Sequence, residues 1–257
     1  MNNKKEKLAR VGMLAKGVVY AIIGTLTAMA AFNLGGSKSG NENVLQFLAG
    51  QPFGQVLLAL LGVGLFGYTF YRFYEAFKGS GDSWGEVKGF FKRAGFIVSG
   101  VFYGALGVTA LRMVLGGSSG SRGSSVISTL MEKSYGPYVV GFIALCLAGK
   151  AIFQIYKAYS GTFRDDVNES SLSQQEQKTL IRAGKIGFIS RGIVSGIVAF
   201  LFFKVATGSG GDTGGKVAAF EFLQDNFGAT VMGIIALGLV AYAVFMFIQA
   251  KYAQIRI

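Results

Sequence analysis

The chain has 257 residues, of which 51% are hydrophobic and 15% are charged, with 39 glycines and only 2 prolines. This apolar excess is too large for an ordinary soluble domain and indicates helices that cross a lipid bilayer. The net charge of +12 is spread over many juxtamembrane positions without a dense basic cluster, so we expect no nucleic-acid partner.

Several classes of chemistry need residues that the sequence does not have. The chain contains no histidine and a single cysteine, Cys146. Histidine- and cysteine-based metal sites, haem ligation through imidazole and Ser-His or Cys-His catalysis are therefore excluded. We expect no enzyme, no catalytic residue, no metal site and no cofactor.

Six apolar stretches follow one another along the chain, each with about the 20 residues that a membrane-spanning helix needs. They cover residues 11–33, 53–74, 94–115, 138–159, 185–206 and 228–250. Between the two stretches of each successive pair lies a segment rich in glycine and serine, followed by clustered apolar residues at 44–48, 126–131 and 217–223. This clustering favours short amphipathic helices at the membrane interface or over the bundle.

Equivalent glycines identify one unit that occurs three times. Gly12, Gly17 and Gly24 recur as Gly95, Gly100 and Gly107, and again as Gly187, Gly192 and Ala199, with spacings of 5 and 7 residues throughout. A fixed internal period of this kind indicates a repeated structural unit. We divide a single membrane domain, 1–257, into two-helix repeats at 8–79, 90–161 and 180–254, with a cytoplasmic linker at 162–178.

Two spans per repeat leave all three units facing the same way, so we expect a pseudo-threefold axis along the membrane normal. The predicted fold class is all-α: a polytopic membrane protein with six transmembrane helices in three tandem parallel two-helix repeats. Within the linker, Ser173 followed three residues later by Glu176 predicts a capped helix start.

The basic residues indicate the orientation. Of the 25 lysines and arginines, 15 lie in the tails and even-numbered loops, whereas the intervening loops carry only Lys38, Arg122, Lys133 and Lys216. By the positive-inside rule, this asymmetry predicts a bacterial inner-membrane protein with both termini in the cytoplasm. Basic residues near the surface attract anionic lipids by about 1 kcal/mol each, so anionic lipids are expected partners.

Small residues recur at helical spacing in every repeat. The candidate packing residues are Gly17, Gly24, Gly67, Gly100, Gly104, Gly107, Gly149, Gly192 and Gly196. Spacings of 4 and 3 residues put those of the odd-numbered helices on one face, where backbones approach closely in lipid. We predict helix packing, with a smooth pore wall along the axis as the alternative. Cys146 aligns with Gly64 and Gly238 and is also predicted to pack.

Lys150 is the deepest charge in any predicted span, and it aligns with Tyr68 and Tyr242 of the other repeats. These three residues form a candidate intramembrane polar site, because an ionisable group inside a span is costly and is a functional candidate by default. Two alternatives stay open. Lys150 either extends its ammonium group to the cytoplasmic headgroups or points inward toward an anion, a lipid headgroup or a partner's carboxylate.

Further polar residues lie at the cytoplasmic ends of the spans. Arg72 and Glu75 are one turn apart and are placed to form an ion pair. Lys16 and Arg191 occupy equivalent positions in repeats 1 and 3, with Ser99 in the third place. Headgroup anchoring is the main interpretation of these residues, and a basic vestibule for anions is the alternative.

Two motifs resemble those of a bacterial family of membrane proteins, the domain of unknown function 1206. They are Lys-Gly-Val-Val-Tyr at residues 16–20 and Gly-Gln-Pro-Phe-Gly at residues 50–54, followed by Gly67-Tyr68. Repeat 2 departs from the pattern with Ser99 at the opening base, and repeat 3 with Asn-Phe-Gly at 226–228. The resemblance covers nearly the whole chain and implies the fold and topology but no activity.

The sequence therefore favours an accessory or structural subunit that packs against another membrane protein. The small-residue faces and the lack of redox or nucleophilic side chains support this interpretation. The alternative is a small channel or carrier for an anionic solute or lipid headgroup, with three units around an axial path and Lys150 in the pathway.

Overall fold

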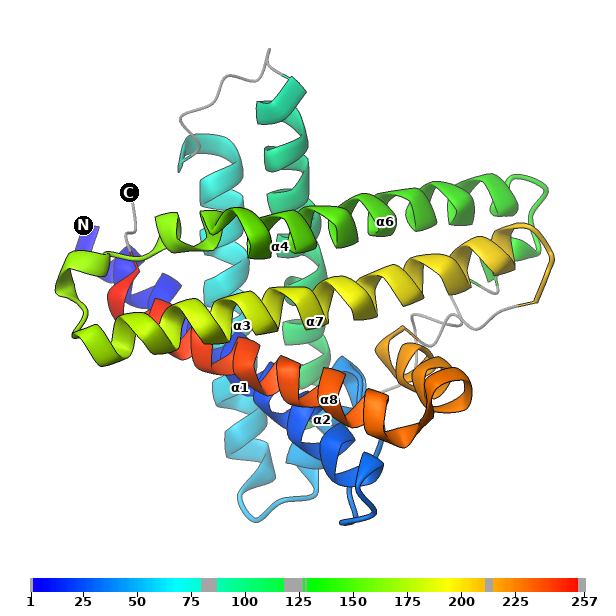
Figure 1. Ribbon diagram of the computed structural model, residues 1–257, viewed down its shortest axis with the longest axis horizontal. Helices are drawn as coiled ribbons and strands as arrows, with labels where there is room; N and C mark the ends of the chain where they lie inside the picture. Colours follow the sequence, from blue (N-terminus) through cyan, green and yellow to red (C-terminus); the bar gives the residue numbers. More distant parts are fainter. Residues whose placement is uncertain (1, 80–86, 118–126, 128, 211–214, 254–257) are drawn as a thin grey trace.

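The structure is a computed structural model that describes residues 2–79, 87–117, 127, 129–210 and 215–253. Its helices are α1 (Asn2–Ala31), α2 (Asn41–Ala49), α3 (Gly54–Tyr74), α4 (Val87–Val114), α6 (Gly136–Ser160), α7 (Gln174–Ala206) and α8 (Lys216–Tyr252). A π-helical turn, Glu75–Gly79, continues α3, and two short 3-10 turns, Thr162–Asp166 and Glu169–Ser171, join α6 to α7. The described residues are therefore almost entirely helical (Figure 1).

Six helices within the described residues are long and apolar enough to cross a membrane. They are Glu6–Ala31, Gly54–Phe77, Gly95–Val114, Gly136–Ser160, Gln174–Ala206 and Lys216–Tyr252. Each falls on one of the predicted spans, with two in every repeat. The prediction of an all-α membrane protein with six transmembrane helices is confirmed.

Short helices lie between the spans of repeats 1 and 3. Helix α2 buries Val44, Leu45 and Leu48 and leaves Phe47 40% exposed, as an amphipathic helix does. In repeat 3 the short helix is the first part of α8, which ends at a kink where Gly228 has φ 82°, a conformation that favours glycine. The predicted helix at 126–131 lies partly outside the described residues, as does Arg122; residues 127 and 129–131 are helical.

The long helices form three pairs, α1 with α8, α3 with α4, and α6 with α7. Each pair joins the second helix of one repeat to the first helix of the next, and α8 with α1 closes the cycle from repeat 3 to repeat 1. Figure 1 shows the pairs running in three different directions across one another. Within repeats, α1 also packs on α3, and α7 on α8. This cyclic order is the pseudo-threefold arrangement.

Repeat 2 differs from its sisters in the part of the chain that the structure describes. Helix α4 packs mainly on α3, and α6 packs mainly on α7, but α4 and α6 are not packed together. The pseudo-threefold arrangement is therefore complete between repeats and interrupted inside repeat 2.

The linker holds the N-terminal end of α7 and the C-terminal end of α8 together. Ser173 accepts a hydrogen bond from the backbone N–H of Glu176, whose carboxylate accepts one in return from Ser173, as the sequence predicts. The backbone N–H of Asn168 donates to the carbonyl of Tyr252 at 2.9 Å. Phe163 is only 1% exposed, so the linker contributes to the core.

Both ends of the described chain lie at the same end of the molecule (Figure 1). The Arg10 guanidinium on α1 donates to the carbonyl of Ala250 on α8 at 2.8 Å. It also pairs with Glu6 at 2.7 Å. An antiparallel α1 and α8 pair thus brings the first and last helical turns together.

Candidate functional site

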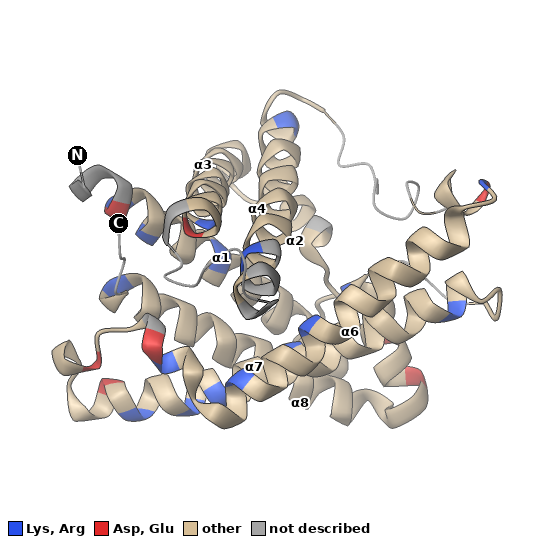
Figure 2. Ribbon diagram, turned by 90° about the horizontal axis from the view of Figure 1, so that it is seen from above, with Lys and Arg blue, Asp and Glu red and all other residues tan. Residues whose placement is uncertain are grey.

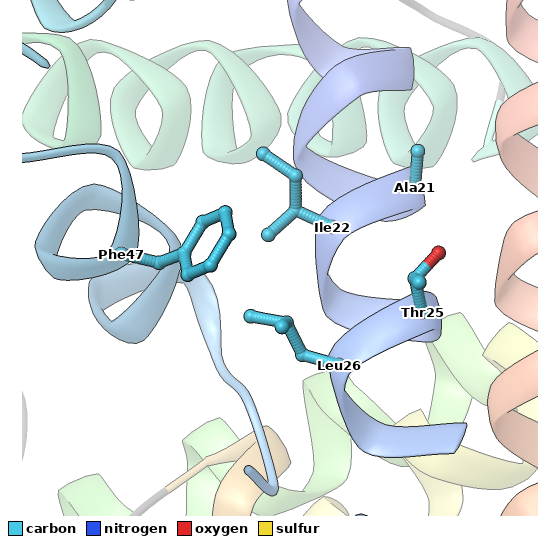
Figure 3. Close-up of a pocket in the computed structure, with 5 residues that line it drawn as sticks. All are labelled: Ala21, Ile22, Thr25, Leu26 and Phe47. Carbon is cyan, nitrogen blue, oxygen red and sulfur yellow. The ribbon is translucent and has the colours of Figure 1, made fainter. Parts of the chain in front are cut away.

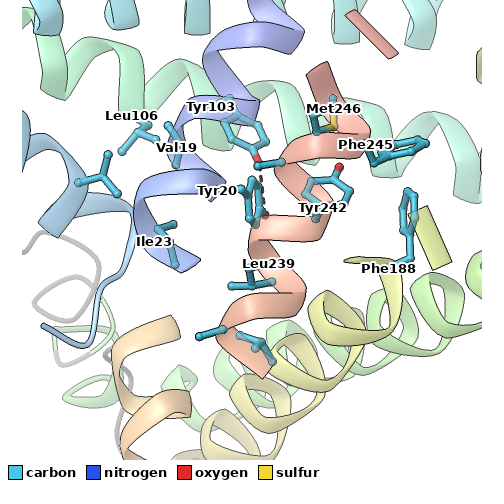
Figure 4. Close-up of a cluster of buried hydrophobic side chains, with 14 of the residues drawn as sticks. Val19, Tyr20, Ile23, Tyr103, Leu106, Phe188, Leu239, Tyr242, Phe245 and Met246 are labelled. Carbon is cyan, nitrogen blue, oxygen red and sulfur yellow. Dashed lines mark hydrogen bonds between the residues drawn. The ribbon is translucent and has the colours of Figure 1, made fainter. Parts of the chain in front are cut away.

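Four buried tyrosines meet where the helix pairs cross. Tyr20, Tyr68, Tyr103 and Tyr242 are each at most 5% exposed and come from α1, α3, α4 and α8. The rings of Tyr20 and Tyr242, and those of Tyr68 and Tyr103, lie edge to face with centroids 4.9 Å apart in each case. The hydroxyl of Tyr103 donates to that of Tyr20 at 3.4 Å (Figure 4). We call these four residues the tyrosine core.

The repeats explain why the tyrosines converge. Tyr20 and Tyr103 each follow three residues after an equivalent glycine of repeats 1 and 2, and Tyr68 and Tyr242 are equivalent positions of repeats 1 and 3. Helices related by the pseudo-threefold arrangement carry these positions to the same place. Sequence reasoning singled out Tyr68 and Tyr242 but missed Tyr20 and Tyr103, which the same alignment of repeats contains.

Lys16 is buried against the tyrosine core with 4% of its surface exposed. Its ammonium group donates to the hydroxyl of Tyr68 at 2.8 Å. It also lies 4.7 Å from the ring centroid of Tyr68, 5.4 Å from that of Tyr103 and 5.5 Å from that of Tyr242. Cation–π attraction, worth about 0.5–2 kcal/mol per contact, offsets part of the cost of burying this charge. No carboxylate among the described residues pairs with Lys16.

Arg191 reaches the tyrosine core from α7. Its guanidinium carbon lies 4.1 Å from the ring centroid of Tyr242 and 5.0 Å from that of Tyr20. Within the described chain it has ring contacts but neither a hydrogen-bond acceptor nor a carboxylate partner. Because a guanidinium carries five N–H donors, Arg191 has donors to spare for a bound acceptor.

Lys216 and Arg72 extend the positive charge in two directions. Lys216 lies 4.2 Å from the ring centroid of Tyr20 and donates to the side-chain oxygen of Asn41 at 2.9 Å. Arg72 donates to the hydroxyl of Tyr68 at 2.7 Å and forms an ion pair with Glu75. The sequence indicates only a loop charge at Lys216, because no sequence pattern relates it to Tyr20.

Together these contacts form a ladder of cations, which we define as Lys216, Arg191, Lys16 and Arg72. Neighbouring cations contact the same tyrosine ring. Lys216 and Arg191 share Tyr20. Arg191 and Lys16 share Tyr242, and Lys16 and Arg72 share Tyr68. Among the described residues, Glu75 is the one carboxylate paired with the ladder. Figure 2 shows most acidic residues toward the edges of the molecule.

Lys150 lies outside the tyrosine core, on an exposed side of α6. The structure therefore brings Tyr68 and Tyr242 of the candidate polar site to the same core without their counterpart in repeat 2. Lys150 is still within electrostatic range of Tyr20, Arg191 and Lys216. Lys150 thus adds a cation from repeat 2 near those of repeats 1 and 3. It lies on the second helix of its repeat, whereas Lys16 and Arg191 lie on the first helices of theirs.

Gln154 follows Lys150 by one helical turn and is 4% exposed. Its side-chain nitrogen donates to the Ser195 hydroxyl at 3.1 Å and to the carbonyl of Lys150 at 3.3 Å. Its side-chain oxygen is buried and has no hydrogen-bond partner among the described residues. An unsatisfied buried acceptor is uncommon in folded proteins, so the polar interactions beside Lys150 are incomplete.

The candidate packing glycines differ in how closely their helices approach. A Cβ atom would lie within 3.0 Å of a neighbouring atom at Gly17, Gly24, Gly67 and Gly192, and at 3.3 to 3.5 Å at Gly100, Gly104 and Gly107. At Gly196 the distance is 3.7 Å, and at Gly149 no atom of the part of the chain that the structure describes lies within 4 Å. The close approaches lie between helices, as in small-residue packing, and Gly149 takes no part in one.

A separate cavity of about 200 Å³ lies between α1 and α2 (Figure 3). It is lined by Ala21, Ile22, Thr25, Leu26 and Phe47. This lining is almost wholly apolar, and it suits a hydrocarbon chain better than a polar solute. No group of three or more histidine, cysteine, aspartate or glutamate side chains that could hold a metal ion occurs in the described residues.

Comparison with known proteins places the three repeats in one family. The model described as Domain of Unknown Function (DUF1206) matches the chain three times, at residues 11–79, 94–161 and 186–253. "Uncharacterized protein YxxB" of Bacillus subtilis (strain 168) is 27% identical over 250 residues, which cover 96% of this chain and 90% of the relative. No solved structure matches the chain. The chain therefore belongs to the DUF1206 family, whose domain it carries in three tandem copies.

Proposed function

We propose that this protein binds an anion in the tyrosine core and passes it across the membrane, as a small channel or carrier. The observation that carries the proposal is the ladder of four cations on shared tyrosine rings, with one paired carboxylate. An anionic solute or an anionic lipid headgroup would supply the negative charge that these four cations lack.

The energetics favour an anion over an empty site. A lysine or arginine at the centre of a span costs about 2.5–3.5 kcal/mol, and several like charges close together add their repulsion. Cation–π contacts and the pairing of Arg72 with Glu75 offset only part of this cost. A bound anion would accept hydrogen bonds from Arg191 and neutralise charge along the ladder, so its binding free energy is favourable where a cation's is not.

The ladder has the direction that a pathway needs. Lys216 begins α8, in the segment that we assign to the outer face. Arg72 and Glu75 lie at the C-terminal end of α3, which we assign to the cytoplasmic face. We propose a bacterial inner membrane with both termini in the cytoplasm, supported by the excess of lysine and arginine on that side and by the neighbouring ends of α1 and α8. Anionic lipids are proposed as partners of these basic ends. We propose no enzymatic activity and no nucleic-acid partner.

The test is anion flux through the purified protein in liposomes. Chloride, nitrate and inorganic phosphate serve as probes, with Arg191→Met as the key variant. We expect Arg191→Met to lower flux by about tenfold or more, because it removes the one ladder cation that has no hydrogen-bond partner among the described residues. Lys185→Met is the matched control: Lys185 is also a cation on α7, but it lies 5.5 Å from the ring centroid of Tyr159, outside the core. Absence of flux in the wild type, or equal flux in both variants, contradicts the proposal.

A second candidate is the accessory subunit that the sequence favoured. The observation in its favour is the peripheral position of α6, where only 22% of the apolar span is buried, compared with 61% in α1. Its exposed side carries Tyr138, Phe142 and Leu145 at 81%, 66% and 71% exposure, and large aromatic side chains are enriched at protein interfaces. Extraction in a mild detergent should then recover another membrane protein in stoichiometric amount, whereas a solitary monomer would contradict this role.

A further inference from the structure

In repeats 1 and 3 the two long helices pack against each other in the same way at two places. A Cβ atom at Gly12 would lie 2.5 Å from the Cα of Tyr68, and one at Gly187 would lie 2.5 Å from the Cα of Tyr242. The second place involves Gly64 and Gly238. A Cβ atom there would lie 2.6 Å from the Cβ of Ala15 and of Ser190, respectively. Both repeats therefore depend on backbones that touch where glycine leaves room.

Repeat 2 has the same positions but not the contacts. Gly95 is equivalent to Gly12 and Gly187, and a Cβ atom there would meet no atom of the described residues within 4 Å. Its expected neighbour, Lys150, is exposed. At the second place the equivalent residues are Val98, which is 68% exposed, and Cys146, which is also exposed. Two faces that are packed in the sister repeats thus lie open in repeat 2.

The side chains of repeat 2 give a physical reason for this difference. Valine replaces alanine or serine at position 98, and cysteine replaces glycine at position 146, so α4 and α6 cannot approach as closely as α1 and α3 do. Lys150 also brings a charge to a position where the other repeats bury a tyrosine, which weakens closure further. Closure of repeat 2 is therefore less stable than closure of repeats 1 and 3.

We propose that repeat 2 is a hinged hairpin that alternates between this open arrangement and a closed one. In the closed arrangement α6 packs on α4, with Cys146 against Val98 and the backbone of Lys150 beside Gly95. The Lys150 side chain then joins the tyrosine core, next to Lys16 and Arg191, and the unsatisfied oxygen of Gln154 moves toward α4. The opening is a conformational device of repeat 2, independent of which ligand the core binds.

Disulfide trapping tests this closure with the chain's own cysteine. Val98→Cys adds a thiol at an exposed position, opposite Cys146 in the closed arrangement. A disulfide needs Cβ atoms about 3.5–4.5 Å apart, a spacing slightly wider than that of the sister repeats. After oxidation with copper phenanthroline in native membranes, we expect both thiols to be lost within one chain, and thiol reductant to restore them. Val108→Cys is the matched control, because it lies on α4 ten residues, or about 15 Å, farther along.

Gly95→Leu distinguishes a hinge from chance collisions. The open arrangement has room for the leucine at Gly95, so expression and thermal stability should stay unchanged. The closed arrangement has no such room, so the disulfide yield of Val98→Cys should fall by about tenfold. A second readout needs no added cysteine: Gly95→Leu should raise the rate at which wild-type Cys146 reacts with a membrane-permeant maleimide. Free thiols after oxidation, a yield indifferent to Gly95→Leu, or disulfides only between two copies would each overturn the proposal.

Discussion

Gly24→Ala and Gly196→Ala form a matched pair that tests whether close helix approach stabilises the fold. Gly24 is buried on α1, and Gly196 is half-buried on α7. A Cβ atom at Gly24 would lie 2.7 Å from the carbonyl oxygen of Ala236 and 2.8 Å from the backbone nitrogen of Val240. A Cβ atom at Gly196 would lie 3.7 Å from the Cβ of Ala151, an ordinary van der Waals contact.

The magnitude follows from these distances. Backbone atoms of α8 cannot rotate away as a side chain can, so the Gly24→Ala methyl group must push α1 and α8 apart by roughly 1 Å to reach a normal contact distance. Overpacking of this kind costs about 1–3 kcal/mol. Both variants gain the same helix propensity, about 1 kcal/mol, which cancels between them. The difference in unfolding free energy is therefore about 1–3 kcal/mol, or roughly 2–12 °C in melting temperature for a chain of this size.

The assay is thermal unfolding of the two purified variants in one detergent, followed by circular dichroism. We expect Gly196→Ala to be at least as stable as the wild type and Gly24→Ala to melt several degrees lower. Equal melting temperatures for the two variants would refute the reasoning, because the contact of α1 with α8 would then have room that the distances deny.

Three further predictions concern the linker and repeat 2. Phe163→Ala should lower the unfolding free energy by about 3–5 kcal/mol, measured by the same thermal assay, because its ring packs 5.7 Å from that of Phe188 and is 1% exposed. The hydrogen bond from the Arg164 guanidinium lowers the pKa of Glu169. The ionised Glu169 therefore stabilises the folded linker above the usual carboxyl pKa, and this stabilisation is lost as the pH falls through the lowered pKa of Glu169. Proteolysis of the linker should accordingly speed up below about pH 4. Arg164→Gln should reduce this pH dependence and leave the smaller part that comes from the hydrogen bond of Gln177 to Glu169. Lys150→Tyr should lower anion flux, and adding Ser99→Lys, which gives repeat 2 the residues of repeats 1 and 3 at these two positions, should restore it. A double variant as inactive as the single one would count against a role for a repeat 2 cation in the site.

Much of the fold could be predicted from the spacing of glycines. A period shared by three units identifies the repeat, and the length of each apolar stretch identifies its spans. The order in which the helices pack was harder to predict, because the small residues of a span show that it packs closely but not which neighbouring helix it packs on. In the structure α8, the last long helix of the chain, packs on α1, the first.

The candidate site was predictable only where the repeats agree. The alignment of Tyr68 with Tyr242 identified two residues of the tyrosine core, and Lys16 and Arg191 were found as equivalent cations. Their main interpretation, anchoring to headgroups, does not fit Lys16, which is 4% exposed and bonded to Tyr68. The position of Lys150 could not be predicted, because it depends on whether α4 and α6 pack together.

The tyrosine core and the proposed hinge in repeat 2 both arise because the three repeats differ in sequence at equivalent positions. Three identical repeats would place three equal side chains around the axis, and equal cations would repel one another in a medium of low dielectric constant. This chain instead alternates tyrosine with lysine or arginine, so that rings separate Lys16 from Arg191. The cation of repeat 2, Lys150, lies on the repeat whose two helices are not packed together. Its charge can then join the core or leave it at a smaller free-energy cost than Lys16 or Arg191, and the repeat that tolerates this movement is the one where valine and cysteine keep the helices apart.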